Sequence, residues 1–101
     1  MTKSELARQM VARLPDVPKD DVEQATKILL EQMSFALERG GRCEIRGFGT
    51  FSLHTRSPRI ARNPKTGETL ALAAKRVPHF KPGKLLKETI NQGRAEYPIQ
   101  G

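Results

Sequence analysis

The hydrophobic pattern of this chain of 101 residues changes from a helical period to a strand period near residue 40. Before that point, apolar residues recur three or four positions apart, as they do on one face of an α-helix. From Arg42 onward they alternate with polar residues, as in a strand that has one face on a core. Helices followed by strands predict an α+β fold in a single domain.

Two helices are expected in the first part of the chain. Ser4 is placed to cap the first helix, which should end before Pro15 and Pro18. The second helix should start near Lys19, where acidic residues suit the positive end of the helix dipole, and run to Arg39 before two glycines.

The apolar stripe of the second helix is wider than one short helix and a small sheet can cover. A second subunit packed on the same helices is the economical explanation, and single exposed residues such as Ile28 or Leu30 are the alternative. The stripe consists of Val22, Ala25, Thr26, Leu29, Met33, Ala36 and Leu37, and it is widened by Ile28, Leu30 and Phe35.

The strand pattern predicts two hairpins. The first spans residues 42–54 around a Gly-Phe-Gly turn, and residues 42, 44 and 46 give one side of its first strand only charged side chains. The second has flanks too poor in apolar residues to belong to a core, so residues 56–73 are expected to protrude as a β-ribbon arm. A last strand over residues 75–80 should lie at a sheet edge because Pro78 interrupts it, and a short helix should follow.

Positive charge is concentrated in the second part of the chain. Residues 42–87 hold eleven Lys and Arg against two Asp and Glu, whereas residues 1–41 and 88–101 each carry a net charge of −1. A cationic, turn-rich segment without acids, residues 56–67, lies within this part. Charge of one sign at this density favours a polyanion partner, with a solvated charged surface as the alternative. The pattern predicts nucleic-acid binding.

Other classes of protein fit the sequence less well. Aromatic residues are scarce, which disfavours stacking on single-stranded bases. No signal peptide or apolar run long enough to span a membrane is seen, so a cytoplasmic protein is expected. Cys43, His54 and His79 make no convincing metal site, and no catalytic set appears, so we expect neither cofactor nor enzyme activity. Cys43 is interpreted as a small buried hydrophobe.

Three linked motifs resemble the bacterial histone-like DNA-bending proteins. They are RGFGTF at residues 46–51, RNPKTG at 62–67 and VPHFKPGK at 77–84. The resemblance covers residues 1 to about 92 and is nearest to the beta-type subunits of the family's heterodimeric members. It implies a histone-like domain over residues 1–92, made of a helical dimerisation part (1–40), a three-stranded antiparallel sheet (41–55 and 74–81), a β-ribbon arm (56–73) and a short C-terminal helix (83–92), with 93–101 as a loose tail.

The resemblance further implies an intertwined dimer with a homologous alpha-type subunit and a sharp bend in double-stranded DNA. Such proteins act in recombination, transcription and translation control in the bacterial nucleoid. Pro64 at the arm tip is expected to wedge between base pairs, which is a known device of this family. An ordinary turn proline is the alternative.

The remaining DNA contacts follow from chemistry and from the resemblance together. Arg62 and Asn63 flank Pro64 and can donate to base edges in the minor groove. Arg42, Glu44 and Arg46 are expected to read sequence if the carboxylate holds both arginines, with a weak surface ion-pair ladder as the alternative. The expected phosphate contacts, which include amides at two helix starts, are Thr2, Lys3, Ser4, Arg56, Arg59, Lys65, Lys75, Arg76, Lys81, Gly83, Lys84 and Lys87.

Two further interpretations stay open at this point. A homodimeric, sequence-neutral nucleoid protein of the same fold would carry the same motifs. A basic RNA-binding or ribosomal protein is a different class, since cationic arms also suit RNA. The chain departs from the family pattern at Ala61, where the arm usually has Gly, and in the length of its tail.

Overall fold

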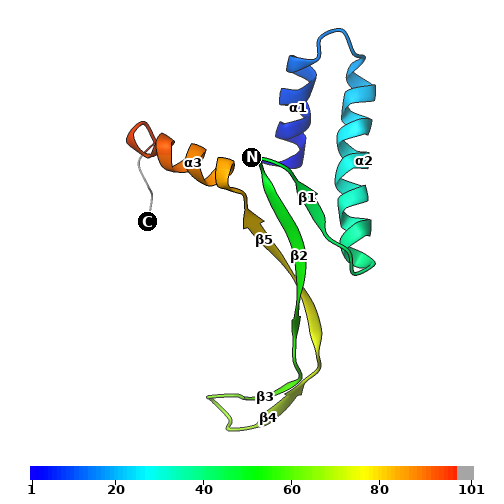
Figure 1. Cartoon of the computed structure of the whole chain (residues 1–101). Coiled ribbons are helices and arrows are strands. Elements are labelled where there is room, and N and C mark those ends of the chain that lie inside the picture. The colour runs from blue at the N-terminus through cyan, green and yellow to red at the C-terminus, as the bar shows by residue number, and fades with distance from the viewer. Residues whose placement is uncertain (98–101) are drawn as a thin grey trace.

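A computed structural model describes residues 1–97 of the chain. Its elements form a helical hairpin, a small sheet that extends into a long arm, and a C-terminal helix (Figure 1). In chain order they are α1 (Lys3–Arg13), α2 (Lys19–Glu38), β1 (Cys43–Ile45), β2 (Gly49–Arg56), β3 (Arg59–Arg62), β4 (Thr69–Leu72), β5 (Lys75–Pro82), α3 (Lys84–Gln92) and a 3₁₀ turn (Gly93–Ala95).

Helix α1 is capped by Thr2 rather than by Ser4, so the predicted cap was wrong. The Thr2 hydroxyl accepts a hydrogen bond from the backbone N–H of Glu5 at 3.2 Å, and the Glu5 carboxylate accepts one from the N–H of Thr2 at 3.3 Å. This reciprocal arrangement needs a Glu or Gln three residues after the cap. Ser4 has Ala7 at that position and cannot form it.

Helix α2 has the predicted extent to within one residue at its C-terminal end. Pro18 stands just before its first turn, and Gly40, with φ of +84°, follows its last. A positive φ suits glycine, which has no Cβ to clash with the carbonyl. The buried side of the helix is small, because only Val22 and Thr26 are buried, and the Thr26 hydroxyl donates to the Val22 carbonyl at 2.9 Å.

The sheet is antiparallel, in the order β1-β2-β5, which places β5 at an edge as predicted. Its apolar side is built around Phe80, whose ring centroid lies 4.6 Å from that of Phe51 and 5.5 Å from that of Phe48. Gly49 lies directly against this ring, since a Cβ added there would come within 2.6 Å of two ring carbons. Glycine is therefore required for the approach of β2 to β5.

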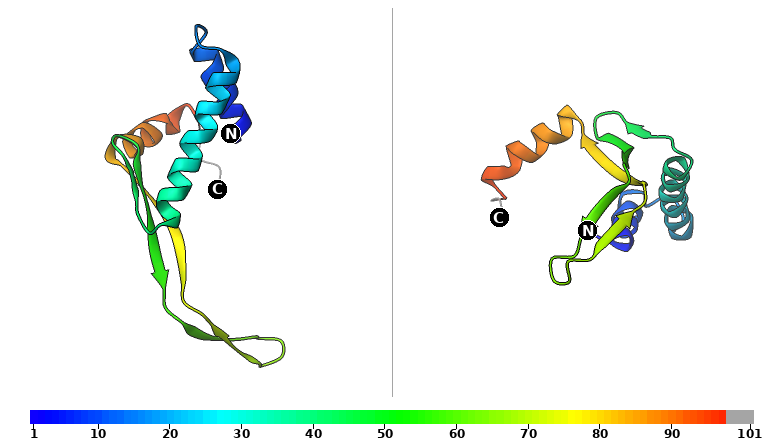
Figure 2. Two further views of the ribbon diagram at one scale, coloured as in Figure 1. Left: turned by 90° about the vertical axis from the view of Figure 1, so that its right-hand side faces the viewer. Right: turned by 90° about the horizontal axis from the view of Figure 1, so that it is seen from below.

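The arm is a continuation of the sheet. The β2–β5 ladder ends at the pair Arg56 and Lys75, and the β3–β4 ladder resumes at the pair Arg59 and Leu72 (Figures 1 and 2). Two residues on each strand lie between the ladders, and Pro58 is one of them, which accounts for the bend of the ribbon at that point. The predicted arm therefore has its base in two strands of the body.

The arm ends in the predicted turn. Backbone hydrogen bonds of 2.8 Å join the N–H of Asn63 to the carbonyl of Glu68 and the N–H of Gly67 to the carbonyl of Asn63. Gly67 has φ of +74°, a value that glycine adopts without strain. Nothing lies within 4 Å of a Cβ placed there, so its role is conformational.

The C-terminal segment is more ordered than predicted. After α3 the chain makes a 3₁₀ turn, in which the N–H of Glu96 donates to the carbonyl of Gly93 at 3.1 Å, and the N–H of Tyr97 donates to the same carbonyl at 2.8 Å. The guanidinium of Arg94 also donates to the side chain of Asn91 at 2.8 Å. The expected loose tail is thus wrong for residues 93–97, and residues 98–101 lie outside the described part of the chain.

The described chain has almost no core of its own. Val22 is its one buried hydrophobic residue within residues 1–97. Large apolar side chains on the helical hairpin remain at least one-third exposed, and they include Met10, Leu14, Val17, Ile28, Leu29 and Phe35. A face of this kind on a short chain indicates burial against a second subunit, in line with the wide stripe seen in the sequence.

Candidate nucleic-acid interface

The register of β2 and β5 divides the side chains of the ribbon between two faces. One face packs on α2, because Leu53, Arg76 and Pro78 line the same hollow as Leu37 and Glu38 of that helix. Residues that alternate with these point the opposite way. We call this second side the open face, and it is formed by Thr50, Ser52, His54 and Arg56 on β2 and by Lys75, Val77, His79 and Lys81 on β5.

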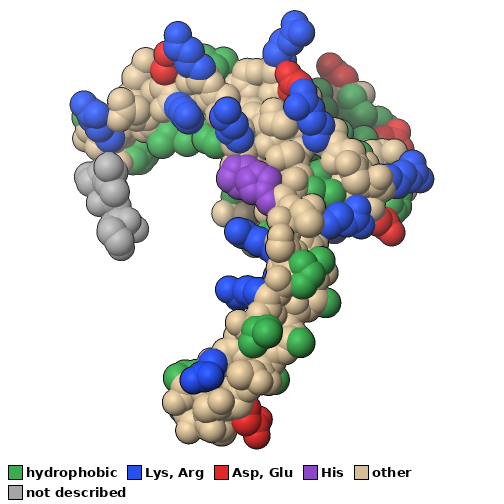
Figure 3. Space-filling view, turned by 60° about the horizontal axis from the view of Figure 1, so that its bottom comes forward, with side chains coloured by type: hydrophobic (Ala, Val, Ile, Leu, Met, Phe, Trp, Pro, Cys, Tyr) green, Lys and Arg blue, Asp and Glu red, His purple; other side chains and the backbone are tan. Residues whose placement is uncertain are grey.

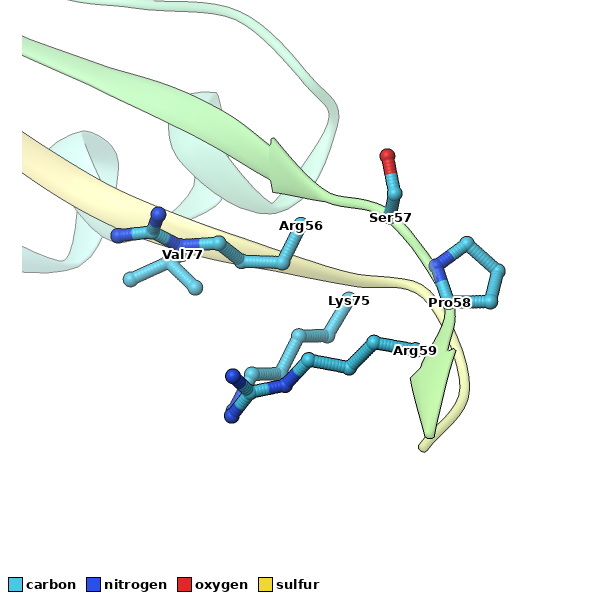
Figure 4. Close-up of a pocket in the computed structure, with 6 residues that line it drawn as sticks. All are labelled: Arg56, Ser57, Pro58, Arg59, Lys75 and Val77. Atoms are coloured by element: carbon cyan, nitrogen blue, oxygen red, sulfur yellow. The ribbon is translucent and has the colours of Figure 1, made fainter. Parts of the chain in front are cut away.

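Three cations surround a hollow of about 610 Å³ at the base of the arm. Arg56, Arg59 and Lys75 line it together with Ser57, Pro58 and Val77. The side chains of Arg59 and Lys75 run side by side from opposite strands (Figure 4). None of the three cations forms an ion pair within residues 1–97. Their charge is available to an anion such as a phosphate.

The arm tip holds its functional groups in a fixed turn. The side-chain oxygen of Asn63 accepts a hydrogen bond from the N–H of Lys65 at 2.9 Å, which leaves the side-chain NH₂ of Asn63 to donate outward. Arg62, Pro64 and Lys65 are exposed. A rigid apolar ring therefore stands at the end of the arm between two groups that can donate hydrogen bonds.

The charged trio on β1 is only partly assembled. The guanidinium of Arg42 donates to the carboxylate of Glu44 at 2.9 Å. Glu44 pairs in register with Thr50, so it lies on the open side of the sheet. Arg46 belongs to the turn after β1 and makes no ion pair with Glu44. The prediction that Glu44 holds both arginines is therefore wrong here, because the strand ends before Arg46.

Two of the expected helix-start contacts are used inside the protein. The N–H of Gly83 donates to the carbonyl of Phe48 at 2.9 Å, and the N–H of Thr2 donates to Glu5. Neither amide is left for a phosphate. The N–H groups of Lys3 and Ser4 in α1 and of Lys84 in α3 remain at helix starts, where backbone donors have no helical partner.

Arg76 lies apart from the other predicted phosphate ligands. Its guanidinium donates to the main-chain carbonyl of Glu38 at 3.1 Å, at the C-terminal end of α2. A cation suits that end of a helix, where carbonyl groups lack partners. The alternation along β5 sends Arg76 to the α2 side, while its neighbour Lys75 faces the open side, and Lys81 shares that side with Lys75.

One pair of side chains on the open face was not predicted from the sequence. The imidazole rings of His54 and His79 are stacked, with centroids 4.3 Å apart and an angle of 20° between their planes. Both side chains are exposed. Their contact depends on the β2–β5 register, which pairs His54 with Val77 and His79 with Ser52. The sequence shows two histidines 25 positions apart and gives no sign of that register.

Figure 3 shows this side of the molecule. The face is hollowed between the arm and α3, and the histidine side chains form one patch at the inner corner where the arm leaves the body. Lys and Arg side chains lie on both sides of that patch, over the body and along the arm. Cations thus border the hollow on both sides of the histidine patch, and such groups attract a polyanion.

Comparison with known proteins agrees with this geometry. Residues 1–91 match the family described as bacterial DNA-binding protein. The integration host factor subunit beta of Histophilus somni is 62% identical over 91 residues, covering 90% of this chain and 97% of that protein. The subunit of the same name from Alkalilimnicola ehrlichii is 59% identical over 100 residues, covering 99% of each chain.

Solved structures show the same fold. A cocrystal structure of Anabaena HU with DNA superposes with a TM-score of 0.76 and is 37% identical, covering 89% of this chain and 97% of that one. An HU variant from Thermotoga maritima gives a TM-score of 0.62 at 32% identity, covering 89% and 99%. The resemblance inferred from the three motifs is confirmed, and the chain belongs to the bacterial DNA-binding protein family, the histone-like DNA-bending proteins.

Proposed function

We propose that this chain is the beta-type subunit of a heterodimer of the integration host factor kind, which binds double-stranded DNA and bends it sharply. The observation that carries the proposal is the continuous ribbon from the sheet to the tip. It places unpaired cations at its base and Pro64 at its end. The names of the relatives support the choice of the beta-type subunit.

The ribbon is suited to the minor groove. A two-stranded arm that enters the groove brings Arg62 and Asn63 to the acceptors on base edges, while Pro64 wedges into a base step. Unstacking a step costs about a few kcal/mol. The bend that follows brings the flanking DNA toward the cations of the open face, and their contacts with phosphate offset that cost.

Sequence preference would come from two sources. DNA sequences that kink easily cost less free energy to bend, so the protein binds them preferentially without contacting their bases. Arg42, positioned by Glu44 at 2.9 Å, is the candidate for direct reading of bases on the body side. Arg46 would join Arg42 and Glu44 through a movement of its side chain or of its turn when DNA binds.

The partner is proposed to be a homologous alpha-type subunit that covers the exposed apolar side of the helical hairpin. Leu29, which is 62% exposed in the single chain, supports this proposal, because the partner would bury its side chain. None of the helices within residues 1–97 has the length and apolar character needed to cross a lipid bilayer. We place the dimer on the bacterial nucleoid in the cytoplasm, with an architectural role in recombination, transcription and translation control.

The test combines assembly and site selection. The purified chain, alone and mixed with an alpha-type relative, is incubated with a mixed pool of duplexes, and the bound fraction is sequenced. We expect the mixture to form a heterodimer with a sharper site preference than either subunit alone. A stable homodimer that binds every duplex equally would favour a sequence-neutral nucleoid protein. Preferential binding of single-stranded RNA loops over duplex DNA would reject both.

A further inference from the structure

The stacked histidines lie at the centre of the proposed DNA surface and have no assigned role there. His54 and His79 come from different strands and are both exposed at the inner corner of the hollow (Figure 3). Neither ring forms a hydrogen bond or an ion pair within residues 1–97. Their nitrogens can therefore bind an incoming ligand.

The charged groups around the pair are mostly cations. Arg56 and Lys75 lie on the open face on the arm side of the rings, and Lys81 lies on the body side. The nearest carboxylate in register is Glu44 of β1, which faces Thr50 and is paired with Arg42 at 2.9 Å. Glu38, the acidic residue at the C-terminal end of α2, lies on the opposite side of the sheet from the rings, where its main-chain carbonyl binds Arg76.

Other positions on this face carry no charge. Val77 lies opposite His54, Ser52 lies opposite His79, and Thr50 follows along β2. Glu44, the carboxylate of β1 on this side of the sheet, is already paired with Arg42 and so is not free to neutralise a protonated ring. An anion that approaches the hollow is the natural partner for such a charge.

Histidine is the side chain whose charge changes between pH 5 and 8. A protonated imidazole donates from both nitrogens and carries the charge that a phosphate oxygen attracts. Two protonated rings stacked 4.3 Å apart repel one another and are also repelled by the neighbouring lysines and arginines. A phosphate placed over the pair removes this penalty, so it favours uptake of a proton when DNA binds.

We propose that His54 and His79 form one proton-linked phosphate-binding site at the base of the arm, so that duplex DNA binds more tightly as the pH falls from 8 to 6. The inference rests on the proposed function. Protons move from solvent to the imidazoles on binding, and no covalent bond forms. A purely structural role, in which the rings only brace β2 against β5, would give no such linkage.

The first experiment uses the assembled dimer and a duplex of about 30 base pairs at constant ionic strength. The dissociation constant is measured at pH 8 and pH 6 for the wild type and for the double variant H54Q/H79Q. Each proton taken up raises affinity about tenfold per unit fall in pH, so an average uptake of about half a proton over these two units corresponds to about a tenfold gain at the lower pH. We expect that gain for the wild type and its loss in the double variant.

Matched controls separate charge from structure. Lys81→Gln removes a permanent cation from the same face, so it should weaken binding by a similar factor at both pH values. His79→Lys should give tight binding at pH 8 with a reduced dependence on pH. Equal pH dependence in the wild type and in H54Q/H79Q would overturn the proposal.

A second measurement needs no variant. Calorimetry of wild-type binding in buffers of different ionisation enthalpy gives the number of protons taken up, and proton NMR of the imidazoles assigns them. We expect net uptake of protons near pH 7, assigned to His54 and His79 by their NMR signals in the complex. No uptake would reject the proposal while binding and bending persist. If the dimer bound no duplex at pH 8 and none at pH 6, the proposed function itself would be rejected.

Discussion

Arg76 donates a hydrogen bond of 3.1 Å to the main-chain carbonyl of Glu38, so this cation of the arm region secures the last turn of α2. Its neighbour Lys75 points to the other side of the same strand, into the hollow at the base of the arm. Two adjacent positive charges therefore serve different purposes. Their separation follows from the alternation of side chains along β5.

Replacing Arg76 with Gln should destabilise the fold and leave DNA contacts largely intact. Loss of the hydrogen bond to the Glu38 carbonyl is expected to lower the free energy of unfolding by about 1 kcal/mol. Thermal unfolding of the assembled dimer measures it, with Lys75→Gln as the control that should melt like the wild type. If Lys75→Gln lowered the free energy of unfolding more than Arg76→Gln, the assignment of Arg76 to the α2 side and of Lys75 to the open face would be wrong.

Replacing Lys75 or Arg59 with Gln should weaken binding to all duplexes alike. Each residue that contacts phosphate contributes about one unit to the slope of log K against log salt concentration, so each variant should lower that slope by about one. Titrations at several salt concentrations measure the slope, and Arg76→Gln should leave it unchanged. An unaltered slope in both variants would show that the hollow at the base of the arm faces no phosphate.

Replacing Pro64 with Ala should reduce bending more than it reduces binding. Alanine lacks the rigid ring that is proposed to hold a base step open, whereas the cations of the arm stay in place. Energy transfer between dyes at the two ends of a duplex measures the bend, and a gel shift at low salt measures binding. Pro15→Ala, which alters a proline in the turn between α1 and α2, serves as the control and should bend DNA like the wild type. Equal bending of DNA by Pro64→Ala and by the wild type would show that Pro64 does not wedge between base pairs.

Replacing Gly49 with Ala should destabilise the sheet more than replacing Gly67 does. A Cβ at Gly49 would lie 2.6 Å from carbons of the Phe80 ring and 2.7 Å from the carbonyl oxygen of Lys81, so the strands must separate. Overpacking of this kind costs about 1–3 kcal/mol. At Gly67 the cost is about 1 kcal/mol of backbone strain at positive φ. Thermal unfolding compares the two, and a larger loss at Gly67 would contradict the packing around Phe80.

The sequence predicted most of the fold because the local signals agree with one another. The helical period before residue 40, the prolines between the helices and Pro78 in an edge strand each correspond to a feature of the structure. The turn at the arm tip was likewise predictable from Asn63, Pro64 and Gly67. These features depend on residues close together in the chain.

The details of the site depend on register, which the sequence does not reveal. Three contacts require a particular pairing of β2 with β5 or with the start of α3. They are the hydrogen bond from Arg76 to α2, the stacking of His54 on His79, and the hydrogen bond from the Gly83 N–H to the Phe48 carbonyl. The end of β1 before Arg46 is a similar case. A shift of one residue would reverse each face, so period alone could not assign these contacts.

The structure of the assembled dimer bound to duplex DNA is the decisive measurement of whether the arm bends DNA by wedging Pro64 into it. We expect a sharply bent duplex, the arm in the minor groove, and a base step opened around Pro64 with phosphates near Arg59 and Lys75. A straight, fully stacked duplex with residues 56–73 directed away from it would rule out bending by the arm.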